Sequence, residues 1–152
     1  MMYIIQDSNP ATAVNLLPDS IKFKQLIELM QLLSSVNLTN VYKPVKQGKL
    51  LKEWILNNKE FTLHYFTTLT HWCFENVNLT SQTIKDINTV LFDLYNKIDY
   101  VLPVVINNIP FRCSKNYTEG ININNKLLPI EEGTLEYIKY VKWKVQNKIW
   151  RI

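Results

Sequence analysis

The sequence predicts a mainly α-helical protein: a single-domain helical bundle over residues 1–152 that begins with a short extended segment and has room for a small β-hairpin near residues 101–127. Three observations predict this fold. Apolar residues recur at intervals of three and four in several long segments, which is the spacing of one helix face. The chain has only 3 Gly, so no flexible linker divides it. Residues 100–129, rich in Asn and Pro, are the one long stretch that breaks the helical pattern.

A helix over residues 19–33 is expected at the centre of the bundle. Its apolar residues follow the i, i+3, i+4, i+7 spacing and form a broad stripe: Phe23, Leu26, Ile27, Leu29, Met30, Leu32 and Leu33. A stripe wider than one partner helix can cover indicates several neighbouring helices. Asp19 or Ser20 is expected to cap the first turn.

The remaining elements are expected on either side of this helix. Residues 3–6 form an extended lead-in, and Asn9 followed by Pro10 is typical of the start of a short helix that ends near residue 17. Thr80 or Ser81 is expected to cap the helix with the most regular apolar stripe. Four further helices share such a stripe and are expected over residues 49–57, 59–76, 81–98 and 131–148, the second of them buried on most of its circumference.

The stretch over residues 100–129 has a different pattern. Val101 to Ile106 is apolar and is predicted to be extended and buried. Ser114 to Lys126 is polar and predicts an exposed loop or a small hairpin through Ile121 and Ile123.

Several function classes lack the residues that they need. No apolar run approaches the roughly 18 residues of a membrane span, so no membrane partner is expected. The N-terminus has no basic region before an apolar one, which predicts an intracellular protein, in the host cytoplasm if it is viral. Phosphate-loop, nucleophile-elbow and zinc motifs are missing, so no cofactor and no metal are expected. Cys73 and Cys113 are expected to be buried thiols, and His64 and His71 to have one hydrogen-bond partner each.

Positive charge is concentrated near the end of the chain. The net charge is +4, and residues 136–152 contain five basic side chains against the single acid Glu136. This distribution is typical of a surface that binds nucleic acid, although lysines near a helix C-terminus also interact favourably with the macrodipole. A second segment, a loop leading into a helix, has a lysine at every third residue. The candidate nucleic-acid-binding residues are Lys43, Lys46, Lys49, Lys139, Lys142, Lys144, Lys148 and Arg151.

A polar set in the first part of the chain is the alternative site. Lys24, Glu28 and Gln31 share one face of the predicted 19–33 helix and carry groups that bind a polar ligand, but a Lys-Glu pair four residues apart is also a common surface ion pair. Asp7 and Asn9 precede the first helix, where the same residues serve as turn and cap. If the protein is an enzyme, its candidate catalytic residues are Asp7, Asn9, Asp19, Lys24, Glu28 and Gln31.

The last predicted helix and the residues after it also interleave aromatic rings with cations. Tyr137, Tyr140, Trp143 and Trp150 alternate with the lysines. Aromatic rings that lie beside lysines can bind single-stranded nucleic acid, because the bases stack on the rings while the lysines pair with the phosphates. The alternative is that these rings pack against the rest of the protein.

The order of several short motifs resembles a family of small phage and bacterial proteins. The motifs here are Asp7-Ser8-Asn9-Pro10, Asp19 with Lys24, Glu28 and Gln31, then Tyr42-Lys43-Pro44, and finally Trp143-Lys144 in a tyrosine- and lysine-rich segment. Members of that family open with D-x-[DN]-P, continue with D-K-H-x-x-K-x-x-x-E-x-x-Q and K-P-T-H-x-x-H-P, and close with W-K. The resemblance implies a mainly helical fold and a phage-like context. Ser20 and Ile21 replace the family's Lys-His, and Lys46 and Lys49 stand where it has histidines.

Three functions are consistent with these patterns. The first is a non-catalytic, phage- or virus-like helical protein that contacts nucleic acid or a nucleoprotein partner through its basic C-terminal helix. The second is a small enzyme acting on nucleotides or nucleic acid, with a polar site on the 19–33 helix. The third is a protein-interaction module, such as a virion component or an inhibitor of a host factor.

Overall fold

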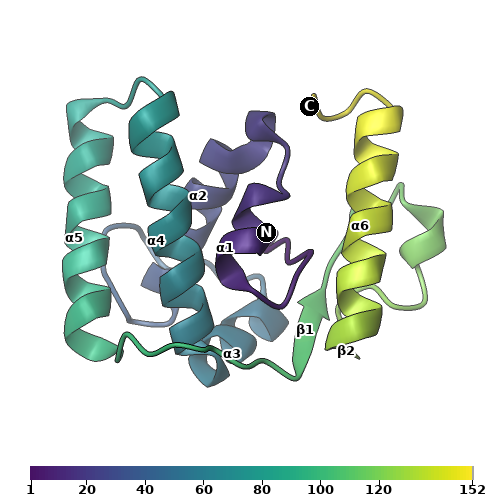
Figure 1. Ribbon diagram of the computed structural model, residues 1–152, viewed down its shortest axis with the longest axis horizontal. Helices are drawn as coiled ribbons and strands as arrows, with labels where there is room; N and C mark the ends of the chain where they lie inside the picture. Colours follow the sequence, from purple (N-terminus) through teal and green to yellow (C-terminus); the bar gives the residue numbers. More distant parts are fainter. Residues whose placement is uncertain (152) are drawn as a thin grey trace.

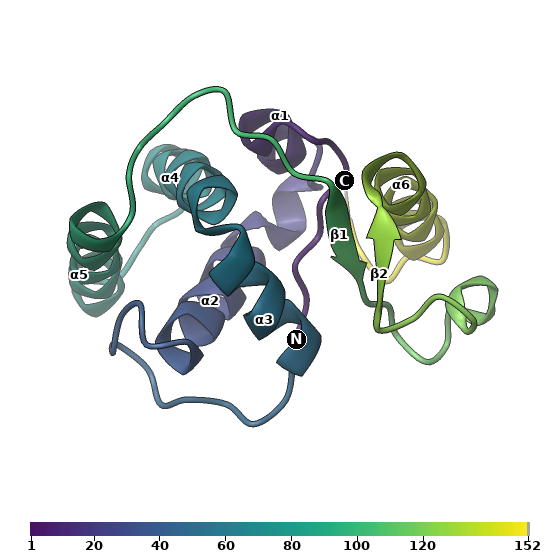
Figure 2. The same cartoon turned by 90° about the horizontal axis from the view of Figure 1, so that it is seen from below.

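The computed structural model describes residues 1–151 and is mainly α-helical, as predicted (Figure 1). Its elements in chain order are α1 (Pro10–Asn15), α2 (Asp19–Ser35), α3 (Lys49–Asn57), α4 (Lys59–Asn76), α5 (Ser81–Lys97), β1 (Asn108–Phe111), the 3-10 helix η1 (Thr118–Gly120), β2 (Lys126–Pro129) and α6 (Ile130–Gln146). Helices α5 and α6 lie at opposite ends of the molecule in Figure 1. Figure 2 shows the two strands between α6 and the other helices.

Helix α4, rather than α2, has the central position in the helical part. It packs against α1, α2, α3 and α5, whereas the main helical neighbours of α2 are α3 and α4. The apolar side chains of α4 on several faces are fully buried, which confirms the predicted burial of residues 59–76. The expectation that residues 19–33 form the centre was wrong, because part of the α2 surface is covered by extended chain instead of by another helix.

That extended chain is the N-terminal segment, in which Tyr3, Ile4 and Ile5 are fully buried. The side-chain amide of Gln25 on α2 accepts a hydrogen bond from the Ile4 N–H and donates one to the Met2 carbonyl, each at 2.9 Å. The Tyr65 hydroxyl on α4 donates to the Ile4 carbonyl at 2.8 Å. Because a buried backbone must find hydrogen-bond partners, these side chains are what allow the segment to lie inside the core without pairing as a strand.

Helix α6 packs against the two-stranded antiparallel sheet. Asn108 is paired with Pro129 and Phe111 with Lys126, and α6 contacts both strands. Gly133 permits this close approach, because a Cβ atom there would lie 2.3 Å from Cγ1 of Ile109. The hydrophobic core continues from the N-terminal segment through the helices to β1 and α6.

The stretch over residues 100–129 differs in detail from the prediction. A small sheet is present, but Ile121 and Ile123 lie in the loop between its strands. The apolar run before β1 was predicted to be buried, yet Leu102 is 70% exposed and Val105 is 78% exposed, and only Ile106 is buried. The reason is topological: these residues cross the outside of the molecule from α5 to β1 (Figure 2).

The predicted helix starts are confirmed at two positions and wrong at a third. Asn9 accepts from the Thr12 N–H and caps α1, and Thr80 accepts from the Thr83 N–H and caps α5. Helix α2 has no side-chain cap, because it begins at Asp19 itself and Pro18 occupies the cap position. Asp19 therefore lies inside the first turn, where its carboxylate pairs with Lys22.

Candidate anion-binding site

A pocket of about 250 Å³ lies where α2, the residues after β1 and the end of α6 meet. Three cationic side chains from these three elements line it: Lys24 of α2, Arg112 after β1 and Lys144 of α6. Glu28, one turn after Lys24 on α2, is the carboxylate among the lining residues. The structure thus brings two residues of the predicted polar set into one pocket, together with one cation of the predicted basic helix.

The chain after β1 is held by side-chain acceptors at three consecutive backbone N–H groups. The N–H of Arg112 donates to the Tyr137 hydroxyl at 3.1 Å, and the N–H of Ser114 donates to the Tyr140 hydroxyl at 3.0 Å. Between them, the N–H of Cys113 donates to Oδ1 of Asn124 at 2.9 Å. These bonds position the Arg112 and Ser114 side chains at the pocket wall before any ligand is present.

Two polar atoms at this wall have no hydrogen-bond partner among the described residues. They are Nη1 of Arg112 and Oγ of Ser114, and both atoms are buried. A buried polar group without a partner destabilises a protein by about 1–3 kcal/mol, and more when it is charged. Neither atom has exposed surface, so the Arg112 and Ser114 side chains have to turn before they can meet an acceptor in the pocket, and that turn would give each atom the partner it lacks.

The remaining charged groups of the pocket have partial internal partners. Oε2 of Glu28 accepts a hydrogen bond from the Met2 N–H at 2.9 Å. The Lys144 ammonium lies 5.5 Å from the centre of the Tyr140 ring and 5.2 Å from that of Trp150. Both distances are within the range of a cation–π contact, so the two rings orient Lys144. No carboxylate in residues 1–151 lies within ion-pair distance of its ammonium.

The aromatic rings of the α6 region are mostly packed inside the protein. Tyr137 is fully buried, Tyr140 is buried, and Trp143 stacks against neighbouring rings. This packing is the alternative interpretation of the interleaved rings, and it is confirmed for these residues. Trp150 is half-buried and still lines the pocket.

A free thiol also lines the pocket. Burial raises the pKa of Cys113, and the charge of Lys144 partly opposes that shift. Cys73 in α4 is buried as predicted, and burial raises its pKa to about 11. Thiols with raised pKa values are poor nucleophiles near neutral pH, so neither cysteine has the character of a catalytic one.

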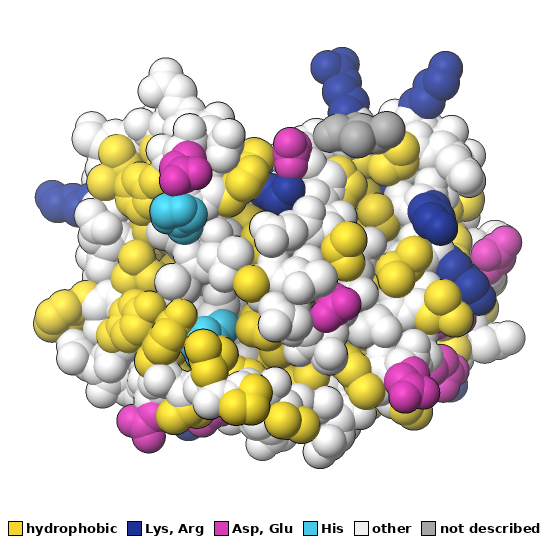
Figure 3. Space-filling view, in the orientation of Figure 1, with side chains coloured by type: hydrophobic (Ala, Val, Ile, Leu, Met, Phe, Trp, Pro, Cys, Tyr) yellow, Lys and Arg dark blue, Asp and Glu magenta, His cyan; other side chains and the backbone are white. Residues whose placement is uncertain are grey.

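The outer side of α6 and the tail after it form a second basic feature, which we call the α6 basic surface: Lys139, Lys142, Lys148 and Arg151. All four side chains are exposed. Lys139 is 3.4 Å from Glu136, and the other three have no carboxylate within ion-pair distance in residues 1–151. Figure 3 shows Lys and Arg side chains gathered over α6, with carboxylates toward its other end. The tail is held in place because Ser20 of α2 donates a hydrogen bond to the Arg151 carbonyl.

The other predicted basic segment lies elsewhere. Lys43 and Lys46 are exposed on the loop between α2 and α3. This loop is attached to α5, where the Thr39 hydroxyl donates to Asp93 at 2.8 Å, and from there it crosses the face opposite α1 toward α3 (Figure 2). Its last residue, Gly48, lies beside the pocket wall, since a Cβ atom there would be 3.6 Å from Nη1 of Arg112. Lys49 is exposed in the first turn of α3.

The structure does not bring the six predicted catalytic residues together. Asp7 accepts a hydrogen bond from the Asn9 N–H, and both residues belong to the turn and cap of α1. Asp19 pairs with Lys22, which is buried and also donates to the Leu17 carbonyl at 2.9 Å. Gln31 is half-buried on α2. Only Lys24 and Glu28 share a pocket.

Arg112 and Ser114 are the pocket residues that sequence reasoning missed. No local spacing links them to Lys24, because they approach it only when β1 and α6 fold back beside α2. Arg112 is directly after the buried residues of β1, and a cation immediately after an apolar run is the weak signal that was available. The buried Lys22 was missed too, since it belongs to none of the predicted polar or basic sets.

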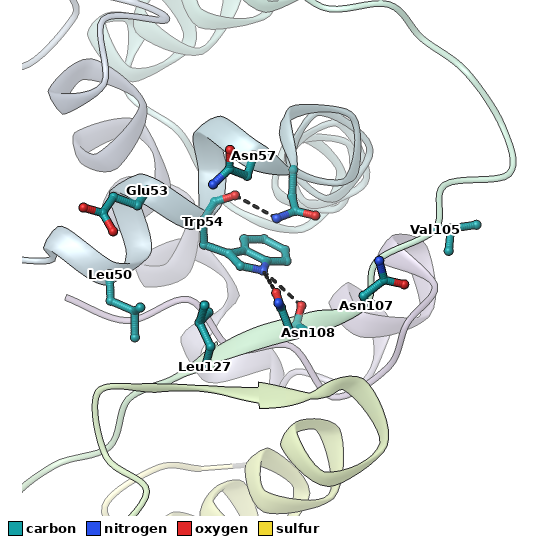
Figure 4. Close-up of a pocket in the computed structure, with 9 residues that line it drawn as sticks. Leu50, Glu53, Trp54, Asn57, Val105, Asn107, Asn108 and Leu127 are labelled. Atoms are coloured by element: carbon teal, nitrogen blue, oxygen red, sulfur yellow. Dashed lines mark hydrogen bonds between the residues drawn. The ribbon is translucent and has the colours of Figure 1, made fainter.

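A second pocket, of about 370 Å³, lies between α3 and the start of β1 (Figure 4). Trp54 lines this pocket, and its indole N–H points at Asn108. The N–H donates to both the backbone carbonyl and the side-chain oxygen of Asn108 at 3.0 Å. Asn58 donates to the Trp54 carbonyl at 3.0 Å. Trp54 is only 3% exposed, so its ring offers little surface to a ligand and its polar groups already have partners.

An apolar surface lies at the α5 end of the molecule. Phe92 is 69% exposed, and Tyr95, Tyr100 and Leu102 are exposed as well. Apolar side chains gather in this part of the space-filling view (Figure 3). Beside it, His64 bonds to the Val101 carbonyl at 2.9 Å, which confirms the expected single partner of this histidine.

Membrane-spanning helices and metal-binding clusters are both absent from residues 1–151. Within residues 1–151, no helix combines the length and the apolar character needed to cross a bilayer. The same residues contain no cluster of three or more His, Cys, Asp or Glu side chains able to hold a metal ion.

Comparisons with known proteins leave the function to be argued from this geometry. The resemblance to the phage and bacterial family stays a prediction. No protein-family model, no curated protein and no solved structure matches the chain.

Proposed function

We propose that this protein binds nucleic acid, without catalysing a reaction, through the α6 basic surface. The observation that supports this function is the group of exposed cations on α6 and its tail, three of which lack a carboxylate partner in the described chain. Unpaired surface cations attract a polyanion and release its condensed counterions. The nearby pocket adds Lys144, Arg112 and Lys24 to the same end of the molecule.

The length of the basic part of α6 matches a short stretch of nucleic-acid backbone. From Lys139 to the end of α6 at Gln146, the axis rises about 10 Å, which corresponds to about three phosphates along one strand of a duplex. The logarithm of the binding constant falls linearly with the logarithm of the salt concentration. For the four cations of the α6 basic surface, the slope should be no steeper than about −4 for duplex DNA and about −3 for a single strand.

The test is a fluorescence anisotropy titration with single- and double-stranded DNA and RNA over a range of salt. We expect Lys142→Glu to weaken binding and to reduce the salt slope by about 1–2, because it replaces an attracting charge by a repelling one. Lys85→Glu is the matched control: it makes the same charge change on an exposed residue of α5. Absence of binding at low salt, or equal weakening by the two variants, would contradict the proposal.

The loop lysines are tested separately. The double variant Lys43→Glu and Lys46→Glu should leave binding close to that of Lys85→Glu if the contact is confined to the α6 basic surface, because these two lysines are not part of that surface. A loss as large as that of Lys142→Glu would show instead that nucleic acid wraps around the molecule.

The apolar surface favours a second function, the binding of a protein partner. Exposed apolar side chains that gather in one place are typical of interaction sites, and Phe92 and Leu102 are the most exposed of this group. Proteins captured from a lysate by the wild type but not by a Phe92→Ser, Leu102→Ser variant would identify such a partner. Identical capture by both proteins would exclude this surface.

A further inference from the structure

We propose that the pocket lined by Lys24, Arg112 and Lys144 binds the terminal phosphate of a nucleic-acid strand. This inference rests on the proposed function, because the α6 basic surface is what would lead a strand to the pocket. Arg151 of the α6 basic surface directly follows Trp150, and Trp150 lines the pocket together with Lys144. A strand that ends on the α6 basic surface is therefore next to the pocket.

The charge of the pocket matches a terminal phosphate better than an internal one. Its lining has three cations against the carboxylate of Glu28, which already accepts from the Met2 N–H. A phosphate monoester carries about 1.5 to 2 negative charges near neutral pH, whereas a phosphodiester carries only one. The surplus of two positive charges is thus neutralised most completely by a monoester.

The hydrogen-bonding groups of the pocket also fit phosphate oxygens. Nη1 of Arg112 and Oγ of Ser114 are buried and have no partner among residues 1–151. Their backbone is held by Tyr137 and Tyr140, so only the ends of the two side chains have to turn toward a ligand. Guanidinium and hydroxyl donors, together with two lysine ammoniums, are the groups that bind phosphate in proteins.

The size of the pocket is consistent with one end of a strand. About 250 Å³ is below the roughly 300–1,000 Å³ of sites that enclose a drug-sized ligand. A phosphate and the adjoining sugar fit this volume. The half-exposed Trp150 lines the same pocket and offers an aromatic face to the first nucleotide.

The test compares one oligonucleotide sequence with a 5′-phosphate, with a 3′-phosphate and with hydroxyls at both ends, each labelled internally. We expect the wild type to bind one phosphorylated form about tenfold more tightly than the hydroxyl form, as charge-assisted hydrogen bonds to the monoester predict. Arg112→Gln should abolish this preference and leave the affinity for the hydroxyl form nearly unchanged. Lys142→Gln is the matched control, and it should weaken all three forms equally.

Lys24→Gln is a second test of the pocket, in case Arg112→Gln does not fold. Lys24 is exposed on α2, so its replacement leaves the core intact, and it should also reduce the preference for the phosphorylated end. Thermal unfolding of each variant checks that the fold is retained.

The outcomes separate this inference from the proposed function. Oligonucleotides that bind with no preference for a phosphorylated end, or with a preference that survives both Lys24→Gln and Arg112→Gln, overturn the inference and leave the proposed function standing. If no oligonucleotide binds while adenosine monophosphate or inorganic phosphate raises the melting temperature of the wild type but not of Arg112→Gln, both the proposed function and the strand-end assignment are overturned. The pocket is then a site for a free phosphate compound.

Discussion

At the residue scale, single polar side chains decide how the N-terminal segment is buried. Gln25 is fully buried on α2 and uses both ends of its amide on the backbone of Met2 and Ile4. The pairing resembles one step of a sheet ladder, with a side chain in place of the second strand. The sequence contains no sign of this role, because one glutamine among apolar helix residues is equally compatible with a solvated position.

Gln25→Leu should therefore destabilise the protein although it makes the core more apolar. It leaves the Ile4 N–H and the Met2 carbonyl without a side-chain partner, and two such groups predict a loss of about 2–4 kcal/mol in the free energy of unfolding. Urea denaturation followed by circular dichroism measures it. Gln31→Leu, on the same helix at a half-buried position, is the control and should change stability by less than about 0.5 kcal/mol. Equal effects of the two variants would show that the Gln25 amide does not hold the segment.

At the element scale, the position of α6 depends on its contact with β1. Gly133 faces Ile109 so closely that any Cβ atom would clash, and the Tyr137 hydroxyl donates to the Pro110 carbonyl at 2.6 Å. The same helix turns Lys144 toward the pocket and Lys142 outward. The seating of α6 on the sheet thus decides which of its lysines belong to the pocket.

Gly133→Ala tests this seating. Alanine is the better helix former by about 1 kcal/mol, but the clash with Ile109 should cost more than this gain, so we expect a net loss of about 1–3 kcal/mol in the free energy of unfolding. Leu135→Ala, at a residue of the same helix that is 51% exposed, should lose less than about 1 kcal/mol. Denaturant unfolding compares the two, and a Gly133→Ala variant more stable than the wild type would disprove the tight contact.

At the scale of the whole molecule, the core contains several ionisable groups in neutral form. Burial raises the pKa of Tyr3, Tyr65 and Tyr137 well above their ordinary value, and the pKa of Tyr117 to about 12. In the unfolded chain these hydroxyls ionise near the ordinary tyrosine pKa of about 10. Since the unfolded state then binds fewer protons, stability is complete below about pH 9 and falls as the pH rises through the folded-state values.

Alkaline pH should therefore unfold the protein in a single cooperative step. With four fully buried tyrosines, Tyr3, Tyr65, Tyr117 and Tyr137, the free energy of unfolding is expected to fall by up to about 5 kcal/mol per pH unit once the unfolded chain is ionised. Denaturant titrations at a series of alkaline pH values measure this slope, and tyrosinate absorbance should rise together with the loss of helix. Tyr117→Phe removes one contributor and should flatten the slope. Tyrosinate absorbance that develops fully while the helices persist would contradict this account.

Much of the architecture was predictable because it depends on local pattern. Each predicted helix from residue 49 onward is present, with ends that differ by a few residues, since regular apolar spacing and caps such as Thr80 act within one element. Residues 101–106 were placed wrongly for the opposite reason: an apolar run predicts burial, but its actual exposure depends on where α5 ends and β1 begins.

The candidate site was predictable only in part. Lys24, Glu28 and Lys144 were identified as candidates from charge and helical spacing, but as members of two separate sites. Arg112 and Ser114 complete the pocket from the far side of the sheet, and the packing of α6 on β1 is what brings them beside α2. The amino-acid sequence by itself determined the helices, their caps and the basic end of the chain, because these follow from interactions between near neighbours. Only the tertiary structure decided which helix is central and which cations converge, because both depend on contacts between residues far apart in the chain.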